Sequence, residues 1–217
     1  MTPVLDLPWL DWPLSAPHRV LSWSITTPGF VTTDRIVWRE VRNADLPHDL
    51  DVRHWFDQEL AQSGRDGAVA MLTSRDLTAF QTARANAGGA NAEAVVTVGL
   101  SNAERVGHRV DRSAKDWGTI NIAVRSDTPL TEAALIEAVS IVAQARTAAI
   151  LDMAHALPTG IATGTGTDCI AIAAPSGTTA FAGMHTEVGE AMGRAVYDAV
   201  HRAARIWMDT VRREGEY

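Results

Sequence analysis

Residues 162–190 read ATGTGTDCIAIAAPSGTTAFAGMHTEVGE, a stretch that predicts a loop, a buried strand and the start of a long helix. Glycine and threonine alternate up to Asp168, and an apolar run follows. A second polar cluster, Gly183–Glu190, then opens the helix. Hydroxyls, backbone N–H groups, a carboxylate and an imidazole are the mixture that a polar small-molecule site needs. The stretch therefore predicts such a site.

The order of elements around this stretch predicts the fold class. The predicted elements are the strands Ala94–Leu100 and Thr119–Arg125, a helix from an N-cap at Thr128 to about His155, a hairpin formed by Asp168–Ala174 and Thr178–Ala182, and a last helix from Thr186 to about Arg213. Strand-strand-helix thus occurs twice, in ββα units. This order predicts a single α+β domain with a mainly antiparallel sheet and long helices packed on one face. Gly189 and Gly193, one turn apart, would let the last helix approach the sheet closely.

The N-terminal part divides into an arm and the beginning of the domain. Residues 1–17, rich in Pro and Trp, are predicted to be an irregular arm, which makes them a candidate contact in a homodimer. The α+β domain then spans residues 18–217. Its first predicted elements are the strands Arg19–Thr27 and Phe30–Arg42, the helix Val52–Gln62, the strand Gly67–Thr73 and a helical or irregular piece over Asp76–Arg84.

Composition excludes several classes of function. The 217 residues are 46% hydrophobic and 21% charged, as in a soluble globular protein, and the net charge of -7 argues against binding to nucleic acid. Cys169 is the only cysteine, so neither an internal disulfide nor a thiolate metal cage is expected. We expect neither a signal peptide nor a membrane span, and therefore a cytoplasmic protein.

Three residues are candidates for catalysis. Asp168 follows the Gly/Thr loop and is placed to act as a base or to orient His185. His185 opens the last helix and is a candidate general acid or base, with Glu190 orienting it. The alternatives are a turn-forming aspartate bonded to its own backbone and a helix-capping or core histidine.

Other residues are candidates for binding substrate. Thr165, Gly166 and Thr167 offer hydroxyls and N–H groups, although turn glycines are the simpler interpretation. Ser101 and Asn102, at the end of a strand, offer a hydroxyl and an amide to the substrate or an oxyanion, or else form an ordinary turn. Cys169, flanked by apolar residues, is predicted to be buried and inert. No spacing of ligands indicates a metal site, and no cofactor can be inferred.

Four segments together resemble the adenosylcobinamide amidohydrolase family. They are Gly99–Ala103, Gly118–Ile122 (which adds Asn121 to the candidate substrate-binding residues), Thr163–Asp168 and Ala182–Glu190. The resemblance implies a hydrolase that cleaves the aminopropanol amide of adenosylcobinamide, a corrinoid, to give adenosylcobyric acid and 1-aminopropan-2-ol during corrinoid salvage. It implies a small-molecule corrinoid as partner.

The chain departs from the family pattern inside its first long helix. Where the family has Glu-Ala-Lys, this chain has Gln144-Ala145-Arg146. If that glutamate takes part in catalysis, Gln144 cannot replace it as a base. Two alternatives therefore stay open: a corrinoid-binding protein without hydrolysis, and an amidohydrolase that acts on a different amide.

Overall fold

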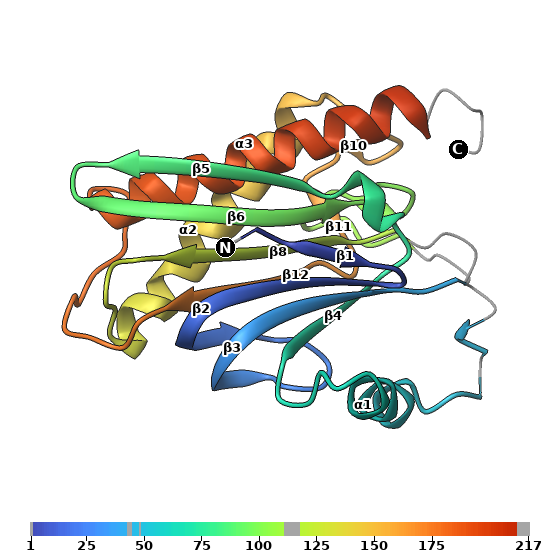
Figure 1. Ribbon diagram of the computed structural model, residues 1–217. Helices are drawn as coiled ribbons and strands as arrows, with labels where there is room; N and C mark the ends of the chain where they lie inside the picture. Colours follow the sequence, from blue (N-terminus) through green and yellow to red (C-terminus); the bar gives the residue numbers. More distant parts are fainter. Residues whose placement is uncertain (1, 43–44, 48, 111–117, 212–217) are drawn as a thin grey trace.

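The main feature of the structure, a computed structural model, is one eight-stranded mixed sheet covered by helices (Figure 1). The structure describes residues 2–42, 45–47, 49–110 and 118–211. In chain order the elements are β1 (Val4–Asp6), β2 (Trp9–Ser22), β3 (Gly29–Glu40), α1 (Val52–Gln62), β4 (Val69–Thr73), the 3₁₀ turn η2 (Leu77–Ala79), β5 (Gln81–Ala87), β6 (Ala90–Val98), β7 (Ala103–Glu104), β8 (Ile120–Ser126), α2 (Glu132–Asp152), β9 (Ala156–Leu157), β10 (Gly160–Ile161), β11 (Gly164–Thr165), β12 (Cys169–Ala174) and α3 (Glu187–Thr210).

The sheet has the order β4-β3-β2-β12-β8-β6-β5, with β1 paired to β2. Two of its pairings are parallel, β3 with β4 and β8 with β12. The other pairings are antiparallel. The predicted α+β class with a mainly antiparallel sheet is therefore confirmed.

The helices cover one face of the sheet. Apolar side chains of β6, β8 and β12 that point to this face, such as Val96, Ile122 and Ile172, form the main core with α2 and α3. The shorter α1 packs on the same face farther along, where Phe56 meets Val37 of β3. Side chains alternate between the two faces of a strand, which is why neighbouring residues enter different cores. The predicted placement of the helices on one face is confirmed.

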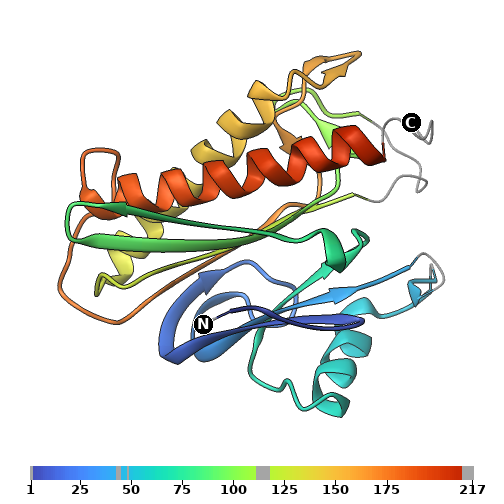
Figure 2. The ribbon, with the colours of Figure 1, turned by 45° about the horizontal axis from the view of Figure 1, so that its top comes forward.

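The sheet is strongly curved, and its opposite face lines the inside of the curve. Leu10, Trp12 and Trp38 from the N-terminal strands pack against Val95 and Ala123 from the other half of the sheet. The curl follows from β2, a long strand whose register with β3 shifts between Pro13 and His18. In Figure 2 the N-terminal strands accordingly diverge from β5 and β6. As a result Asn121 Nδ2 of β8 donates to the Leu72 carbonyl of β4 at 2.7 Å, although three strands separate β4 from β8 in the sheet.

Hydroxyl caps begin both long helices. The Thr186 side chain accepts a hydrogen bond from Gly189 N, as expected for the start of α3. The cap of α2 is Thr131, which accepts from Ala134 N, and not Thr128 as predicted. Arg213, the predicted end of the last helix, lies outside the described residues, and α3 ends at Thr210.

Three other expectations from the sequence are wrong. Residues 4–6 and 9–17 belong to β1 and β2, so the N-terminal segment is part of the sheet and not an irregular arm. β12 pairs with β8 and β2, and residues 178–182 form no strand, so the second ββα unit contains a single strand. The piece over Asp76–Arg84 ends inside β5, which begins at Gln81.

By length and composition alone, α2 is apolar enough to cross a membrane, with 39% of the qualifying window buried. This differs from the expectation that the chain contains no membrane span. In the fold α2 packs against α3 and β12, and a core helix passes the same test.

Candidate functional site

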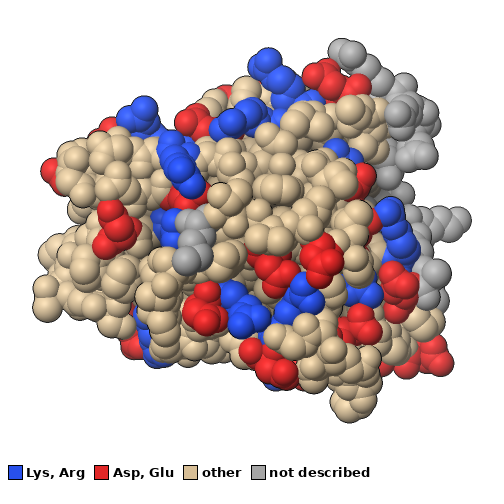
Figure 3. Space-filling view, viewed as in Figure 1, with Lys and Arg blue, Asp and Glu red and all other residues tan. Residues whose placement is uncertain are grey.

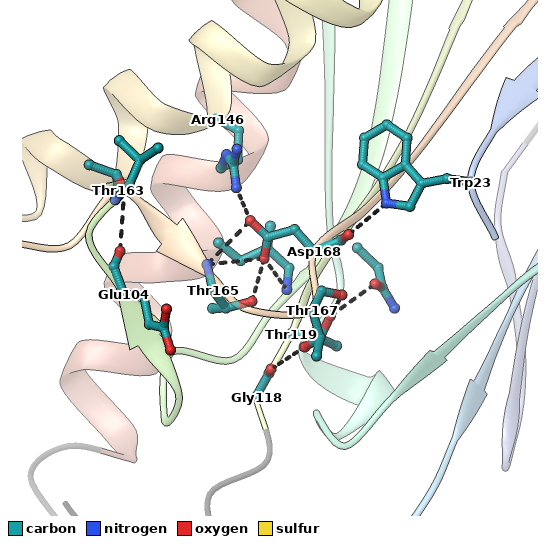
Figure 4. A network of polar contacts seen from close by, with 12 residues as sticks. Trp23, Glu104, Gly118, Thr119, Arg146, Thr163, Thr165, Thr167 and Asp168 are labelled. Atoms are coloured by element: carbon teal, nitrogen blue, oxygen red, sulfur yellow. Dashed lines mark hydrogen bonds and ion pairs between the residues drawn. The ribbon is translucent and has the colours of Figure 1, made fainter. Parts of the chain in front are cut away.

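Asp168 is the centre of a polar network at the start of β12 (Figure 4). Its carboxylate accepts hydrogen bonds from the backbone N–H and the hydroxyl of Thr165, and from Ile120 N of β8 at 3.2 Å. It also forms an ion pair with Arg146 of α2. The side chain is 10% exposed. The Gly/Thr loop is thus tied by one carboxylate to both a neighbouring strand and a helix.

The backbone of the same loop is held from both sides. Thr119 donates to the Thr167 carbonyl at 2.8 Å, and Thr167 donates to the Gly118 carbonyl at 2.9 Å. The indole Nε1 of Trp23 donates to the Asp168 carbonyl at 2.9 Å. These contacts join the start of β8, the start of β12 and the residue after β2 into one rigid unit.

A pocket of about 540 Å³ opens beside this unit, and we call it the amide pocket. Trp23 and Ile25 lie at it with 49% and 41% of their surfaces exposed, so part of its wall is apolar. Its polar residues include Thr119, Thr167 and Asp168 of the network just described, together with Asn121 and Arg42. The residues that line the pocket include Trp23, Ile25, Thr119, Asn121, Thr167, Asp168 and Cys169.

Burial shifts the pKa of two ionisable side chains, Cys169 in the wall of the pocket and Arg146 behind Asp168. Burial raises the pKa of the Cys169 thiol to about 11, so the thiol is protonated at neutral pH and is a poor nucleophile. Burial also lowers the pKa of Arg146, whose side chain is 18% exposed. Among the lining residues that the structure describes, Asp168 is the one carboxylate. Asp168 is therefore the candidate proton acceptor for this pocket, with its carboxylate turned toward Thr165 and Arg146.

The predicted substrate-binding residues divide between the pocket and its surroundings. Asn121 and Thr167 line it, and Thr165 lies behind Asp168. Asn102 is buried behind Gly118, and its Oδ1 has no hydrogen-bond partner among the described residues. A Cβ on Gly118 would lie 2.8 Å from that atom, so glycine is what lets Asn102 approach. Ser101 is half-buried in the same turn, and a Cβ on Gly166 would lie 3.9 Å from Glu104 Oε1.

The structure does not bring His185 and Glu190 to Asp168. Asp168 contacts Ile120, at the start of β8, whereas Glu187 at the start of α3 accepts from Gly89 N in the β5–β6 turn. That turn adjoins the other end of β8, where Ser126 pairs with Ala92. The seven residues of β8 span about 20 Å. His185 and Glu190 are exposed, and the start of α3, at which they lie, is at the opposite end of the sheet from the start of β12 (Figure 1).

The two residues that depart from the family pattern, Gln144 and Arg146, lie on different sides of α2. Residues two apart on a helix face different ways. Arg146 turns inward to Asp168, so a cation is retained there. Gln144 is exposed and lines a groove between α2 and α3 together with Glu190. Gln144 therefore lies outside the amide pocket.

Sequence reasoning missed Trp23, Thr119 and the role of Arg146. Trp23 follows a strand directly, and a large aromatic residue at a strand end was the available signal. No signal marked Arg146 as the partner of Asp168, since only tertiary structure brings α2 to the loop. Among the described residues, no group of three or more His, Cys, Asp or Glu is arranged to hold a metal ion.

Comparisons with known proteins place the chain. Residues 5–211 match the family model described as adenosylcobinamide amidohydrolase. No curated protein matches the chain. Among solved structures, the PH0078 protein from Pyrococcus horikoshii OT3 is similar, with 10% sequence identity, a TM-score of 0.43, and coverage of 90% of this chain and 76% of that one.

Proposed function

The chain belongs to the adenosylcobinamide amidohydrolase family, and we propose that it hydrolyses the aminopropanol amide of adenosylcobinamide to adenosylcobyric acid and 1-aminopropan-2-ol. The family is one of hydrolases in corrinoid salvage.

The observation that carries the proposal is the combination of groups at the amide pocket. Among the described residues that line the pocket, Asp168 is the one carboxylate, and it lies beside hydroxyl and amide groups and an apolar wall. Trp23 is half exposed, yet its indole is fixed by the hydrogen bond to the Asp168 carbonyl. A volume of about 540 Å³ suits a side chain and its amide better than a whole macrocycle. We therefore infer that the amide enters the pocket while the flat corrin ring rests on Trp23 and Ile25.

The chemistry needs a water activated by a base and donors for the developing oxyanion. We assign the base to Asp168, which would take a proton from the attacking water and pass it to the leaving amine. Its oxygens are shared with Thr165 and Arg146, so one of these contacts must lengthen as the water binds. Asn121 is the proposed oxyanion donor, because its Nδ2 carries two hydrogens and Leu72 accepts one of them.

The decisive experiment incubates the purified protein with adenosylcobinamide, with and without added divalent metal ions, and follows the corrinoid by mass spectrometry. Appearance of adenosylcobyric acid is the expected result. Corrinoid that stays bound but unchanged would instead identify a binding protein, and Gln144→Glu would then test whether a lost carboxylate explains it. If neither turnover nor binding is observed, the substrate is a different amide.

A further inference from the structure

A second hollow of about 540 Å³ lies on the other side of the Gly/Thr loop, and we call it the arginine pocket. In Figure 4, Trp23 of the amide pocket and Glu104 of this pocket lie on opposite sides of Asp168. Its walls are the turn Glu104–Arg109, Arg146 and Thr147 of α2, and Thr163–Thr165 of the loop. Nothing in amide hydrolysis requires this pocket.

Among the described residues that line the pocket, three are arginines, Arg105, Arg109 and Arg146, and one carries a carboxylate, Glu104. This excess of positive charge occurs in a chain whose net charge is -7. Elsewhere the two signs are interspersed, as the face in Figure 3 shows. A hollow lined by one sign of charge concentrates ligands of the other sign. The pocket therefore favours an anion.

The arginines differ in how firmly they are held. Arg105 donates to the Ile161 carbonyl at 3.1 Å and lies across Gly160, where a Cβ would come within 3.1 Å of its Cδ. Arg109 is exposed at the rim. Arg105 is thus already oriented before any ligand arrives, which reduces the entropy lost on binding.

One N–H group of Arg146 lacks a hydrogen-bond acceptor among the described residues. It pairs with Asp168 through Nη1, but its Nε is buried with no hydrogen-bond partner among the described residues. A buried donor without a partner costs free energy, more so when it is charged. An anion in the arginine pocket would supply the missing acceptor.

We propose that the arginine pocket binds a phosphate group through Arg105, Arg109 and Arg146. A phosphate monoester carries about -1.5 to -2 charges and three strong acceptor oxygens, which match several guanidinium groups better than one carboxylate does. The phosphate belongs either to a separate small molecule or to a phosphorylated form of the amide substrate, because the two pockets share one loop.

The test titrates the full chain with inorganic phosphate, and then with phenyl phosphate, in a chloride-free buffer of low ionic strength, by calorimetry. We expect saturable binding that Arg109→Ala and Arg105→Lys each weaken by about tenfold or more, the loss of one charge-assisted hydrogen bond. Arg194→Ala is the matched control, since Arg194 is an exposed arginine of α3 whose nearest acidic contact is 3.8 Å away. It should leave the affinity unchanged.

Absence of saturable binding, or equal affinity in all three variants, would show that the arginine pocket is not an anion-binding site. Acetate that binds as tightly as phosphate would overturn the assignment to phosphate. Competition between phenyl phosphate and adenosylcobinamide would assign the phosphate to a substrate, and simultaneous binding would assign it to a separate ligand. Only this last comparison rests on the proposed function, so the titration succeeds or fails independently of amide turnover.

Discussion

At the scale of single residues, Asp168 has a structural role and a proposed chemical role. Its carboxylate holds the loop to β8 and α2, which is the turn-forming role that the sequence left open. It is also the one carboxylate among the described residues that line the amide pocket. Because one carboxylate holds the loop and also acts as the proposed base, its test needs variants that separate loss of folding from loss of turnover.

Asp168→Asn is expected to lower turnover of adenosylcobinamide by about 10²–10⁴-fold, the usual loss when a general base is removed. The measurement is the rate of adenosylcobyric acid formation, with circular dichroism to monitor folding. His185→Ala is the comparison, and it should keep most of the activity because His185 lies at the other end of the sheet.

The ion pair complicates that comparison, because Asp168→Asn leaves the Arg146 charge unpaired. Breaking a buried pair costs about 3–5 kcal/mol, whereas removing both partners is often neutral. The double variant Asp168→Asn with Arg146→Met should therefore fold and remain inactive. Loss of turnover in His185→Ala with an intact fold would show that the amide reacts at the start of α3 and not in the amide pocket.

Cys169 provides a prediction about pH. A rise from 9.0 to about 11 means about 100-fold less thiolate below both values, so iodoacetamide at pH 8 should modify the folded chain about 100-fold more slowly than the chain in urea. Because the folded state favours the protonated thiol, this contribution to stability is complete below pH 9 and is lost as pH rises toward 11. Mass spectrometry of the alkylated chain measures both rates. Equal rates, or loss of turnover in Cys169→Ala, would contradict an inert thiol.

At the scale of elements, the two glycines of α3 make different contacts from those expected. A Cβ on Gly189 would collide with the Gly183 carbonyl and lie 2.7 Å from the Ala182 carbonyl, so Gly189 lets the helix start against the preceding loop. A Cβ on Gly193 would lie 3.5 Å from Ile141 of α2, which is an ordinary contact. Neither glycine serves approach to the sheet.

Gly189→Ala should therefore destabilise the protein by about 1–3 kcal/mol, as overpacking against rigid backbone does. Gly193→Ala should leave the free energy of unfolding unchanged or raise it by up to about 1 kcal/mol, since alanine is the better helix former. Urea unfolding of the two variants beside the parent chain measures both. An equal loss of stability in both variants would show that the helix itself, and not the contact with Ala182 and Gly183, requires glycine at position 189.

At the scale of the whole molecule, the N-terminal strands are part of the core. β2 lies between β3 and β12 in the sheet, and Trp12 is fully buried inside the curl. The curl also brings Leu72 to Asn121 and so forms one side of the amide pocket. An N-terminal arm that merely docked on the domain would contribute neither.

Deletion of residues 2–14, which removes β1 and the first part of β2, should abolish the cooperative thermal transition. Trp12→Ala is the milder version and should cost about 3–5 kcal/mol, the usual cost of truncating a buried aromatic side chain. Calorimetry measures both, with light scattering to record the oligomeric state. A truncated chain that still melts cooperatively, but as a smaller oligomer, would restore the interpretation of a docking arm.

Short-range patterns in the chain were enough to predict its local features. Hydrophobic periodicity and caps placed α1 over Val52–Gln62 and the start of α3 at Thr186, because these signals lie within a few residues of one another. The four segments identified the family, and the Gly/Thr loop located Asp168. Each of these depends on residue types and short spacings alone.

Which of these residues act together depends on contacts between segments that are far apart in the chain. Asp168 and His185 are close in sequence, but β12 carries the chain to the other end of the sheet between them. Arg146 and Trp23 are distant in sequence and meet Asp168 because α2 packs on the sheet and β2 adjoins β12. A hairpin after β12 looked favourable locally, yet β8 and β2 occupy both of its edges. Strand pairing and helix packing are non-local contacts, and no short spacing in the chain encodes them.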